Sequence, residues 1–518
     1  MIRHSSSKLD SLTSVLGLIG LAVLSSYILL SNLDRAFSRA DEAMYVRRVQ
    51  GMIAHSSVLT SYIDDRISLN KPPLAQWLAA ISVNLLGESA TSHRLPNALA
   101  GAVVLWLVVY LTRRWSGSLL AAALAGLALL SCNIFTDTNG VRSAGVEALL
   151  SLFTVATLGI MFEVCERALA EKRSKSALTI LAGVLFGLGI LTKSLAICVT
   201  LLIIALFLTI RSYQSKIPPR QLCSRLAPSL KYFALGALPL PLLYYSLLVI
   251  NYPEALKIAF SQEIVERFKE GYHNSDQPFF YLKLLLVSRR LFAPEAVIIA
   301  IALSIWGVFK RRDAVRLFLV IWALLPLILF SFLSSRLPWY AFTSVPPLAM
   351  LIGVTLAELI HLAKTASSGR LRWIALVTTI LTTIALVSPF PRVFARVQHD
   401  ERIALEDAIR PLRNLWGLNM LSYVSSDVKF DRQQVPYFNF LRATKISDLD
   451  RCKPPVTEAP QTAVALFITR QALNTCDDLK GWSAYTVIPV GKGRKSEVLI
   501  LLAIPSGTPL PSGFKPWA

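Results

Sequence analysis

The chain has 518 residues, of which 54% are hydrophobic and 16% are charged, and its mean hydropathy is +0.53. Soluble domains carry roughly 25% charged residues, so this composition excludes a soluble globular enzyme. Recurring apolar runs exclude a disordered or collagen-like chain, and six scattered cysteines exclude a small disulfide-stapled domain. We therefore expect a polytopic membrane protein.

Apolar runs of about twenty residues predict transmembrane helices, because a helix of that length crosses the roughly 30 Å of bilayer hydrocarbon. The first run is expected to be a retained anchor, since no small-x-small cleavage site precedes Asp34. Between two short apolar runs the chain must reverse its direction, near Lys193. The eleven expected spans lie near residues 12–31, 94–112, 118–135, 144–163, 177–191, 195–210, 232–250, 292–309, 317–334, 339–360 and 373–388.

The position of the basic residues predicts the orientation. The formal net charge is +21, but the excess does not form a patch with interleaved aromatics, so no nucleic-acid partner is expected. The opposite-side segments 32–94 and 251–290 are nearly balanced, as expected when the basic loops are cytoplasmic. The sequence therefore predicts an N-in, C-out chain. With the N-terminus inside, 20 Lys/Arg and 4 Asp/Glu fall in the loops 1–11, 113–117, 164–176, 211–231, 310–316 and 361–372.

Three parts are expected outside the membrane. The first loop, 32–93, is predicted to hold two amphipathic interfacial helices, over Asp41–Ala54 and Pro72–Leu86. The second loop is 251–291, and a C-terminal segment follows. We thus expect a transmembrane domain over residues 1–388 and an extracytoplasmic domain over residues 389–518.

The C-terminal 130 residues are less hydrophobic and predict a small α/β domain. A helix is expected near 399–416, and strands are expected at 463–469, 484–490 and 497–503. Cys452 and Cys476 would be able to pair in an oxidising compartment, but two unrelated thiols fit the spacing equally well.

Ionisable residues at the rims of the spans are functional candidates, because charges are costly there. Each candidate also has an ordinary explanation, such as an acidic first helical turn, a lysine reaching the headgroups, or an interfacial aromatic belt. Their convergence on one membrane face favours a site. The candidates are Asp41 and Glu42 after the first span, Lys71, Arg142 and Glu147, Lys193, Glu266, Arg267 and His273 in the second loop, and Arg336 to Tyr340.

A site made of carboxylates, lysines and arginines that opens sideways to the lipid suits a lipid substrate that carries phosphate. The cations would hold the phosphate and neutralise its developing charge, while a carboxylate takes the proton from an attacking hydroxyl. This chemistry is glycosyl transfer from a polyprenyl-phosphate sugar.

An ordered set of motifs over about residues 10–390 resembles the GT-C glycosyltransferases, which include protein O-mannosyltransferases and the lipid A aminoarabinose transferase. The resemblance implies a GT-C type bundle with an outer cavity, and hydropathy gives the expected count of about 11 transmembrane helices. The motifs are Ser38-Arg-Ala-Asp41-Glu42-Ala-Met-Tyr45, Asn70-Lys71-Pro72-Pro73-Leu74 with Trp77, His93-Arg94-Leu95-Pro96, Arg142 with Glu147, Gly187 to Lys193, Arg267-Phe268 with His273 to Tyr281, and Ser335 to Tyr340.

The resemblance also implies roles for individual residues. The catalytic first-loop acid transfers to Asp41, with Glu42 as its neighbour, and Glu147 stands where relatives usually carry Asp, in a second acidic role. Arg336 stands where Lys is usual. Tyr45 and His273 are possible substrate contacts. The lipid-phosphate or donor pocket would be lined by Lys71, Arg142, Lys193, Arg267, Arg336 and Tyr340.

One position departs from the aminoarabinose type. Those members often have Glu before Lys-Pro-Pro and use it with the second-loop histidine as a metal site. Here the position is Asn70, and an amide with His273 alone is a poor cage for a divalent metal. We therefore expect no required metal and no cofactor.

The sequence thus predicts an inverting glycosyltransferase of the plasma (inner) membrane that uses an undecaprenyl-phosphate-type sugar donor. Its acceptor would be a lipid A-like glycolipid, another envelope polysaccharide or a protein hydroxyl at the outer face. Two other classes stay open: a lipid or solute transporter whose outer charges form a vestibule, and a non-catalytic envelope scaffold. A transporter would be expected to place such charges near the bilayer midplane, in repeated halves.

Overall fold

The computed structural model describes residues 8–34, 40–63, 66–69, 71–136, 140–172, 175–261, 277 and 279–398, and six strands between 419 and 516. The chain divides into two compact units. The bundle unit consists of residues 1–33, 52–61 and 67–398, and the second unit consists of residues 34–51, 62–66 and 399–518. Each unit is described by itself.

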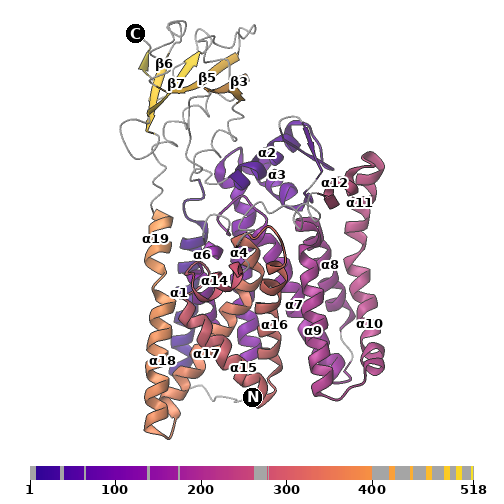
Figure 1. Cartoon of the computed structure of the whole chain (residues 1–518), viewed down its shortest axis with the longest axis vertical. Coiled ribbons are helices and arrows are strands. Elements are labelled where there is room, and N and C mark those ends of the chain that lie inside the picture. Colours follow the sequence, from indigo (N-terminus) through magenta and orange to yellow (C-terminus); the bar gives the residue numbers. More distant parts are fainter. Residues whose placement is uncertain are drawn as a thin grey trace. The chain divides into compact units, whose positions relative to one another are not determined.

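The bundle unit is almost entirely helical (Figure 1). Short 3-10 helices occur at η1 (Ser194–Cys198) and η3 (Pro338–Ser344). The α-helices are α1 (Lys8–Leu30), α3 (Leu74–Leu86), α4 (Ala90–Ser116), α5 (Leu119–Ser131), α6 (Asn133–Thr136), α7 (Glu147–Leu169), α8 (Ser176–Lys193), α9 (Val199–Gln214), α10 (Pro219–Ala237), α11 (Pro239–Asn251), α12 (Ala255–Phe260), α14 (Phe280–Leu286), α15 (Pro294–Arg311), α16 (Ala314–Ser331), α17 (Val345–Thr365), α18 (Gly369–Val387) and α19 (Phe390–Gln398).

Among the described residues, six helical segments are long and apolar enough to cross a bilayer, or seven if the bent pair α10 and α11 forms one span. The apolar stretches Leu16–Leu30, Leu74–Leu86 and Leu119–Ser131 are shorter. The expectation of a mainly helical membrane bundle is confirmed. The count of eleven spans and the N-in, C-out orientation stay predictions.

One of these six segments, Ser176–Gln214, contains two of the expected spans. The helix α8 ends at Lys193, where Ser194 adopts a positive φ of 47°. The following η1 returns against α8 so closely that a Cβ on Gly189 would lie 2.8 Å from Ile197. The chain therefore reverses at Lys193, as the two short apolar runs predicted.

Contacts with α7 show that α8 and α9 run in opposite directions. The partners of α7 lie progressively earlier along α8 and then later along α9, which fits a helical hairpin. From the N-terminus of α7, these contacts join Glu147 to Lys193 of α8, Thr157 to Ala182 of α8, Phe162 to Phe207 of α9, and Glu166 to Arg211 of α9.

Small residues allow the closest helix packing in the bundle. An added Cβ on Gly183 of α8 would lie 2.1 Å from the carbonyl oxygen of Phe233 in α10, and one on Gly236 of α10 would lie 2.1 Å from the carbonyl oxygen of Ile180. On the other side, Gly353 of α17 approaches the backbone of α5. Glycine permits such backbone contact, which membrane helices use for association.

Ion pairs join the helices at the end of α7 opposite Glu147. Arg114 of α4 donates to Glu163 at 3.0 Å, Arg211 of α9 pairs with Glu166 at 3.2 Å, and Arg225 of α10 pairs with Glu171. Basic residues thus concentrate at the end of the bundle for which the sequence predicts a cytoplasmic location.

The second unit contains most of α2 (Ala40–Ala54) and the strands of a mixed sheet. In α2, Gly51 leaves no room for a Cβ, which would lie 2.5 Å from the carbonyl oxygen of Tyr62 in β1 (Ser61–Ile63). The strand β1 pairs with β2 (Arg66–Ser68). Helices therefore form at both predicted first-loop positions, as α2 and α3, while their interfacial location stays a prediction.

The C-terminal strands form a six-stranded sheet in the order β4-β3-β5-β7-β6-β8. The strands are parallel across β4, β3 and β5 and antiparallel from β5 onward. The three predicted strands are confirmed as β5, β6 and β7, whereas the helix predicted near 399–416 and both Cys452 and Cys476 lie outside the described residues. The strands are β3 (Asn419–Ser425), β4 (Thr444–Ile446), β5 (Thr462–Thr469), β6 (Ala484–Pro489), β7 (Glu497–Ala503) and β8 (Lys515–Pro516).

Candidate functional site

The centre of the candidate site in the bundle unit is an ion pair between two helix ends. Glu147 is the first residue of α7 and Lys193 is the last residue of α8, positions where the helix dipoles favour an anion and a cation respectively. Lys193 Nζ lies 2.5 Å from Glu147 Oε1, and the two side chains are only 16% and 10% exposed. The sequence placed both residues at one rim, and the structure joins them.

Tyr340 completes this group from η3. Lys193 Nζ lies 5.3 Å from the centre of the Tyr340 ring, a cation–π contact. The ring of Phe330 in α16 packs against Tyr340 with 5.6 Å between centroids, and Tyr340 is 9% exposed. Three segments far apart in the sequence thus bring a carboxylate, an ammonium and a phenol ring together.

Hydrogen bonds hold the segment that carries Tyr340. The hydroxyl of Tyr281 in α14 donates to the carbonyl oxygen of Leu337 at 3.0 Å. Burial raises the pKa of Tyr281 well above its usual range, so the hydroxyl stays protonated and acts as a donor. Arg336 Nε donates to the carbonyl oxygen of Ser331 at 3.2 Å. Tyr281 ends one of the motifs named above, but its hydrogen bond to Leu337 could not be predicted from the sequence pattern.

Two buried arginines, one in the segment before α7 and one in α4, donate to the chain just after α1. Arg142 is 1% exposed and donates to the carbonyl oxygen of Ser31 at 2.8 Å. Arg94 is fully buried and donates to the carbonyl oxygen of Leu33 at 2.7 Å. Arg142 thus has an anchoring contact here, and its predicted contact with the donor stays a prediction.

Asn97 fixes the same segment. Its Nδ2 atom donates to the carbonyl oxygens of Gly140 and Ser143, at 3.0 and 2.9 Å. Asn97 was not among the predicted site residues, because a single asparagine within an apolar helix carries no recognisable pattern. Its position near the start of α4 sets the approach of the chain to Glu147.

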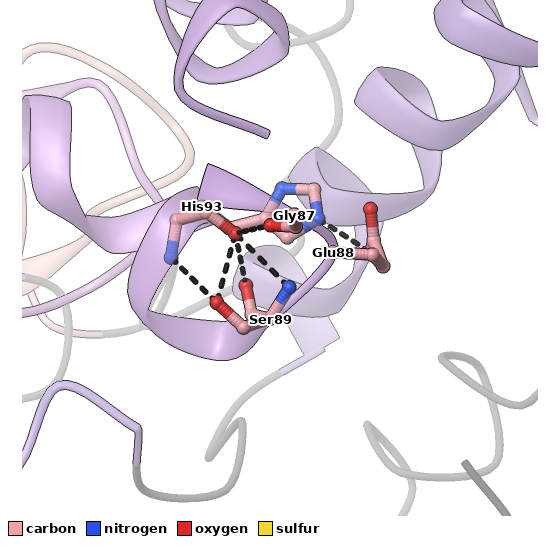
Figure 2. A network of polar contacts seen from close by, with 5 residues as sticks. Gly87, Glu88, Ser89 and His93 are labelled. Carbon is pink, nitrogen blue, oxygen red and sulfur yellow. Dashed lines mark hydrogen bonds and ion pairs between the residues drawn. The ribbon is translucent and has the colours of Figure 1, made fainter. Parts of the chain in front are cut away.

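A polar network at the start of α4 is shown in Figure 2. His93 Nε2 lies 2.7 Å from Glu88 Oε1, and the histidine side chain is 1% exposed. Ser89 and Ser92 form a capping box, and Ser92 Oγ also donates to the carbonyl oxygen of Gly87 at 2.7 Å. The motif His93-Arg94 therefore anchors the helix start in this structure.

Lys71 lies on the segment that leads into α3. Leu74 and Trp77 of α3 pack around a small apolar cluster that includes Leu191 of α8. Trp77 Nε1 donates to the carbonyl oxygen of Val58 at 2.7 Å, which ties the first loop to the same helix. The segment that begins with Lys71 is thus packed beside the end of α8 that carries Lys193.

The remaining first-loop candidates lie on α2, in the second unit. Asp41 is exposed at the start of α2, and Glu42 is 3% exposed. Arg48 stacks over the ring of Tyr45, with 5.5 Å from Cζ to the ring centre. Acidic residues in a first helical turn are favoured by the helix dipole, so α2 presents Asp41 to solvent at a stable helix start.

Asn70, Arg267 and His273 lie outside the described residues. Within the part of the chain that the structure describes, no group of three or more His, Cys, Asp or Glu side chains is arranged to hold a metal ion. The predicted independence from metal stays a prediction.

The Glu147, Lys193 and Tyr340 group is suited to holding an anion. Lysine carries three N–H donors, so a lysine oriented by a carboxylate keeps further donors for phosphate oxygens. Low exposure strengthens such contacts, because solvent screens them less.

Comparison with known proteins identifies the kind of fold. The family model described as dolichyl-phosphate-mannose-protein mannosyltransferase matches residues 70–224, which include Lys71, Glu147 and Lys193. The undecaprenyl phosphate-alpha-4-amino-4-deoxy-L-arabinose arabinosyl transferase 1 of Pseudomonas fluorescens (strain Pf0-1) is 27% identical over 357 residues, which cover 67% of this chain and 58% of the relative. The corresponding transferase of Erwinia tasmaniensis is 25% identical over 61% of this chain and 55% of the relative. The match thus spans less than two thirds of these relatives.

Two solved structures share the architecture. The structure of ArnT from Cupriavidus metallidurans bound to undecaprenyl phosphate has a TM-score of 0.63 at 17% identity and covers 95% of this chain and 99% of that one. The oligosaccharyltransferase of Archaeoglobus fulgidus in its apo form has a TM-score of 0.54 at 12% identity and covers 97% of this chain and 76% of that one. The family-model match and these structures agree with the resemblance found in the sequence, and the chain is a multi-pass membrane protein with an ArnT-like fold.

Proposed function

We propose that the chain is a glycosyltransferase of the plasma membrane that moves a sugar from a polyprenyl-phosphate donor to an acceptor at the outer face. The observation that carries this proposal is the ion pair of Glu147 and Lys193, whose lysine contacts the ring of Tyr340. Glu147 and Lys193 both lie inside the segment that matches the mannosyltransferase family model. The names of the curated relatives support an undecaprenyl-phosphate-linked donor.

In this mechanism the bundle cations bind the donor phosphate. Lys193, oriented by Glu147, donates to the phosphate oxygens, with Lys71, Arg267 and Arg336 as further cations from the predicted set. Negative charge grows on the phosphate as its bond to the sugar breaks, so cations fixed beforehand stabilise the transition state more than the ground state.

Asp41 is the proposed general base. It removes the proton from the attacking acceptor oxygen while that oxygen forms a bond to the anomeric carbon from the face opposite the leaving phosphate, which inverts the configuration. Glu42 and Tyr45 share the same helix and are proposed to position the acceptor. The acceptor class we favour is a phosphorylated glycolipid such as lipid A, with a protein hydroxyl as the alternative.

The first test compares wild type and Asp41→Asn in detergent, with a radiolabelled undecaprenyl-phosphate sugar and envelope glycolipid acceptors. Wild type should release undecaprenyl phosphate with or without a chelator. Asp41→Asn should lose activity by roughly 100-fold or more, because general base catalysis contributes about 10² to 10⁴, and should still bind the donor.

Asp34→Asn is the matched control, since it neutralises another carboxylate of the same loop, and it should retain activity. Release by Asp41→Asn at the wild-type rate would exclude Asp41 as the base. Transport of the donor by wild type without any sugar transfer would instead support the transporter alternative.

A further inference from the structure

A polar pocket in the bundle unit shares no residue with the Glu147, Lys193 and Tyr340 group. It has a volume of about 160 Å³ and is lined by Asn133, Arg289, Ser388, Pro389, Arg392 and Val393. Its walls come from the start of α6, the segment between α14 and α15, and the turn from α18 to α19.

The pocket walls are fixed by contacts outside the pocket itself. The backbone N–H of Ile134 donates to the carbonyl oxygen of Arg290 at 3.0 Å, which joins α6 to the segment before α15. On the other side, Tyr27 of α1 packs against Phe394 of α19 with 6.2 Å between ring centroids. The two arginines are therefore brought together by the fold, from positions more than a hundred residues apart in the sequence.

The lining is cationic. No carboxylate is among the lining residues, and Arg392 makes no ion pair with any residue that the structure describes. Arg289 pairs with Glu295 at 2.9 Å, but both side chains are about half exposed, at 51% and 54%, so this pair is weak. Two guanidinium groups with a neighbouring amide and hydroxyl match the oxygens of a phosphate, which arginine binds in bidentate fashion.

The depth of Arg392 agrees with the level of lipid headgroups. Arg392 comes 20 positions after Arg372, and α18 and α19 follow one another along the left edge of the bundle in Figure 1. At about 1.5 Å per helical residue this separation is about 30 Å, the thickness of the hydrocarbon core. Arg372 and Arg392 would thus lie at the two opposite surfaces of the bilayer.

The side of the bundle next to the pocket is apolar and faces outward. Ile384 and Val387 at the end of α18 are 60% and 53% exposed, and Val287 after α14 is 74% exposed. Only 28% of the most apolar window of Gly369–Ala395 is buried. A cationic pocket at the end of a lipid-facing surface is reached by a lipid whose chains lie along that surface.

We propose that this pocket binds the phosphate of an anionic membrane lipid. The volume is close to the roughly 150 Å³ of an engineered cavity that takes up benzene, so the pocket has room for a headgroup phosphate. The lipid would neutralise Arg289 and Arg392 and hold α19 against α6. This inference does not depend on the proposed transferase activity.

The test uses the full-length protein, delipidated in detergent, with native mass spectrometry to measure binding. The probes are phosphatidic acid, diacylglycerol with the same chains, and inorganic phosphate. Wild type should bind phosphatidic acid in preference to the other two. Arg289→Gln/Arg392→Gln should raise the dissociation constant for phosphatidic acid by roughly 10-fold or more, because hydrogen bonds to charged groups are lost.

Arg370→Gln is the matched control, since it removes an exposed arginine from the other end of α18 and should leave the affinity unchanged. Arg392→Lys keeps the charge without the guanidinium fork and should give an intermediate affinity, even if the double variant folds poorly. Equal affinities of wild type and Arg392→Gln for phosphatidic acid would overturn the proposal. Binding of inorganic phosphate as tightly as phosphatidic acid would overturn the assignment to a lipid.

Discussion

At the scale of the residue, Glu147 and Lys193 form a largely buried ion pair between the ends of two helices. Each was recognisable alone, because a charge at the rim of an apolar span is unusual. Their contact was not recognisable, since they are 46 positions apart and meet only because α8 runs antiparallel to α7. Asn97 had no signal, and Tyr281 was recognisable only as the end of a motif, because both side chains donate to backbone carbonyls that only the fold brings near.

Substitutions in this ion pair should distinguish its contribution to protein stability from its contribution to sugar transfer. Lys193→Met should lower the stability of the protein by about 3–5 kcal/mol, because it leaves a largely buried carboxylate without its cation. Glu147→Gln/Lys193→Met should recover most of this stability but no sugar transfer, since the donor phosphate would still lack Lys193. Thermal unfolding in detergent and transfer assays on the same samples measure both effects.

The control for this pair is Arg114→Met/Glu163→Gln, at the other end of α7. That pair is 50% and 35% exposed, so its loss should change stability by less than about 1 kcal/mol. Recovery of sugar transfer in Glu147→Gln/Lys193→Met would show that the ion pair contributes to stability and not to sugar transfer.

At the scale of the element, backbone contact between α8 and α10 holds in place the helix that ends at Lys193. Gly183→Ala or Gly236→Ala should weaken this packing by about 1–3 kcal/mol, because the new methyl group would meet backbone atoms 2.1 Å away, which have no free rotamer to move into. The melting temperature and the monodisperse fraction after detergent extraction should both fall.

Gly20→Ala in α1 is the matched control, since nothing lies within 4 Å of its added Cβ. Unchanged melting temperatures for all three variants would show that α8 and α10 are not packed as described. The hydropathy pattern predicts that these helices exist, but close approach depends on which faces meet.

At the scale of the whole molecule, the charge asymmetry predicts which side of the membrane each loop occupies. Cys223 is exposed and lies in a loop expected inside, and Lys257 is 83% exposed in a loop expected outside. In single-cysteine variants expressed in a bacterial host, an impermeant maleimide should label Lys257→Cys in intact spheroplasts and Cys223 only after permeabilisation. The reverse pattern would contradict the N-in, C-out orientation.

The sequence by itself determined that the chain is a helical membrane protein, where its longest apolar helices lie, that it reverses near Lys193, and that three strands form after residue 460. These features follow from local hydropathy and periodicity, which act over a few tens of residues. Only the tertiary structure decided that Glu147, Lys193 and Tyr340 meet, and that Arg289 and Arg392 share a pocket. The physical reason is that these groups lie on helices whose faces and directions are fixed by packing between distant segments, and one-dimensional patterns do not record that packing.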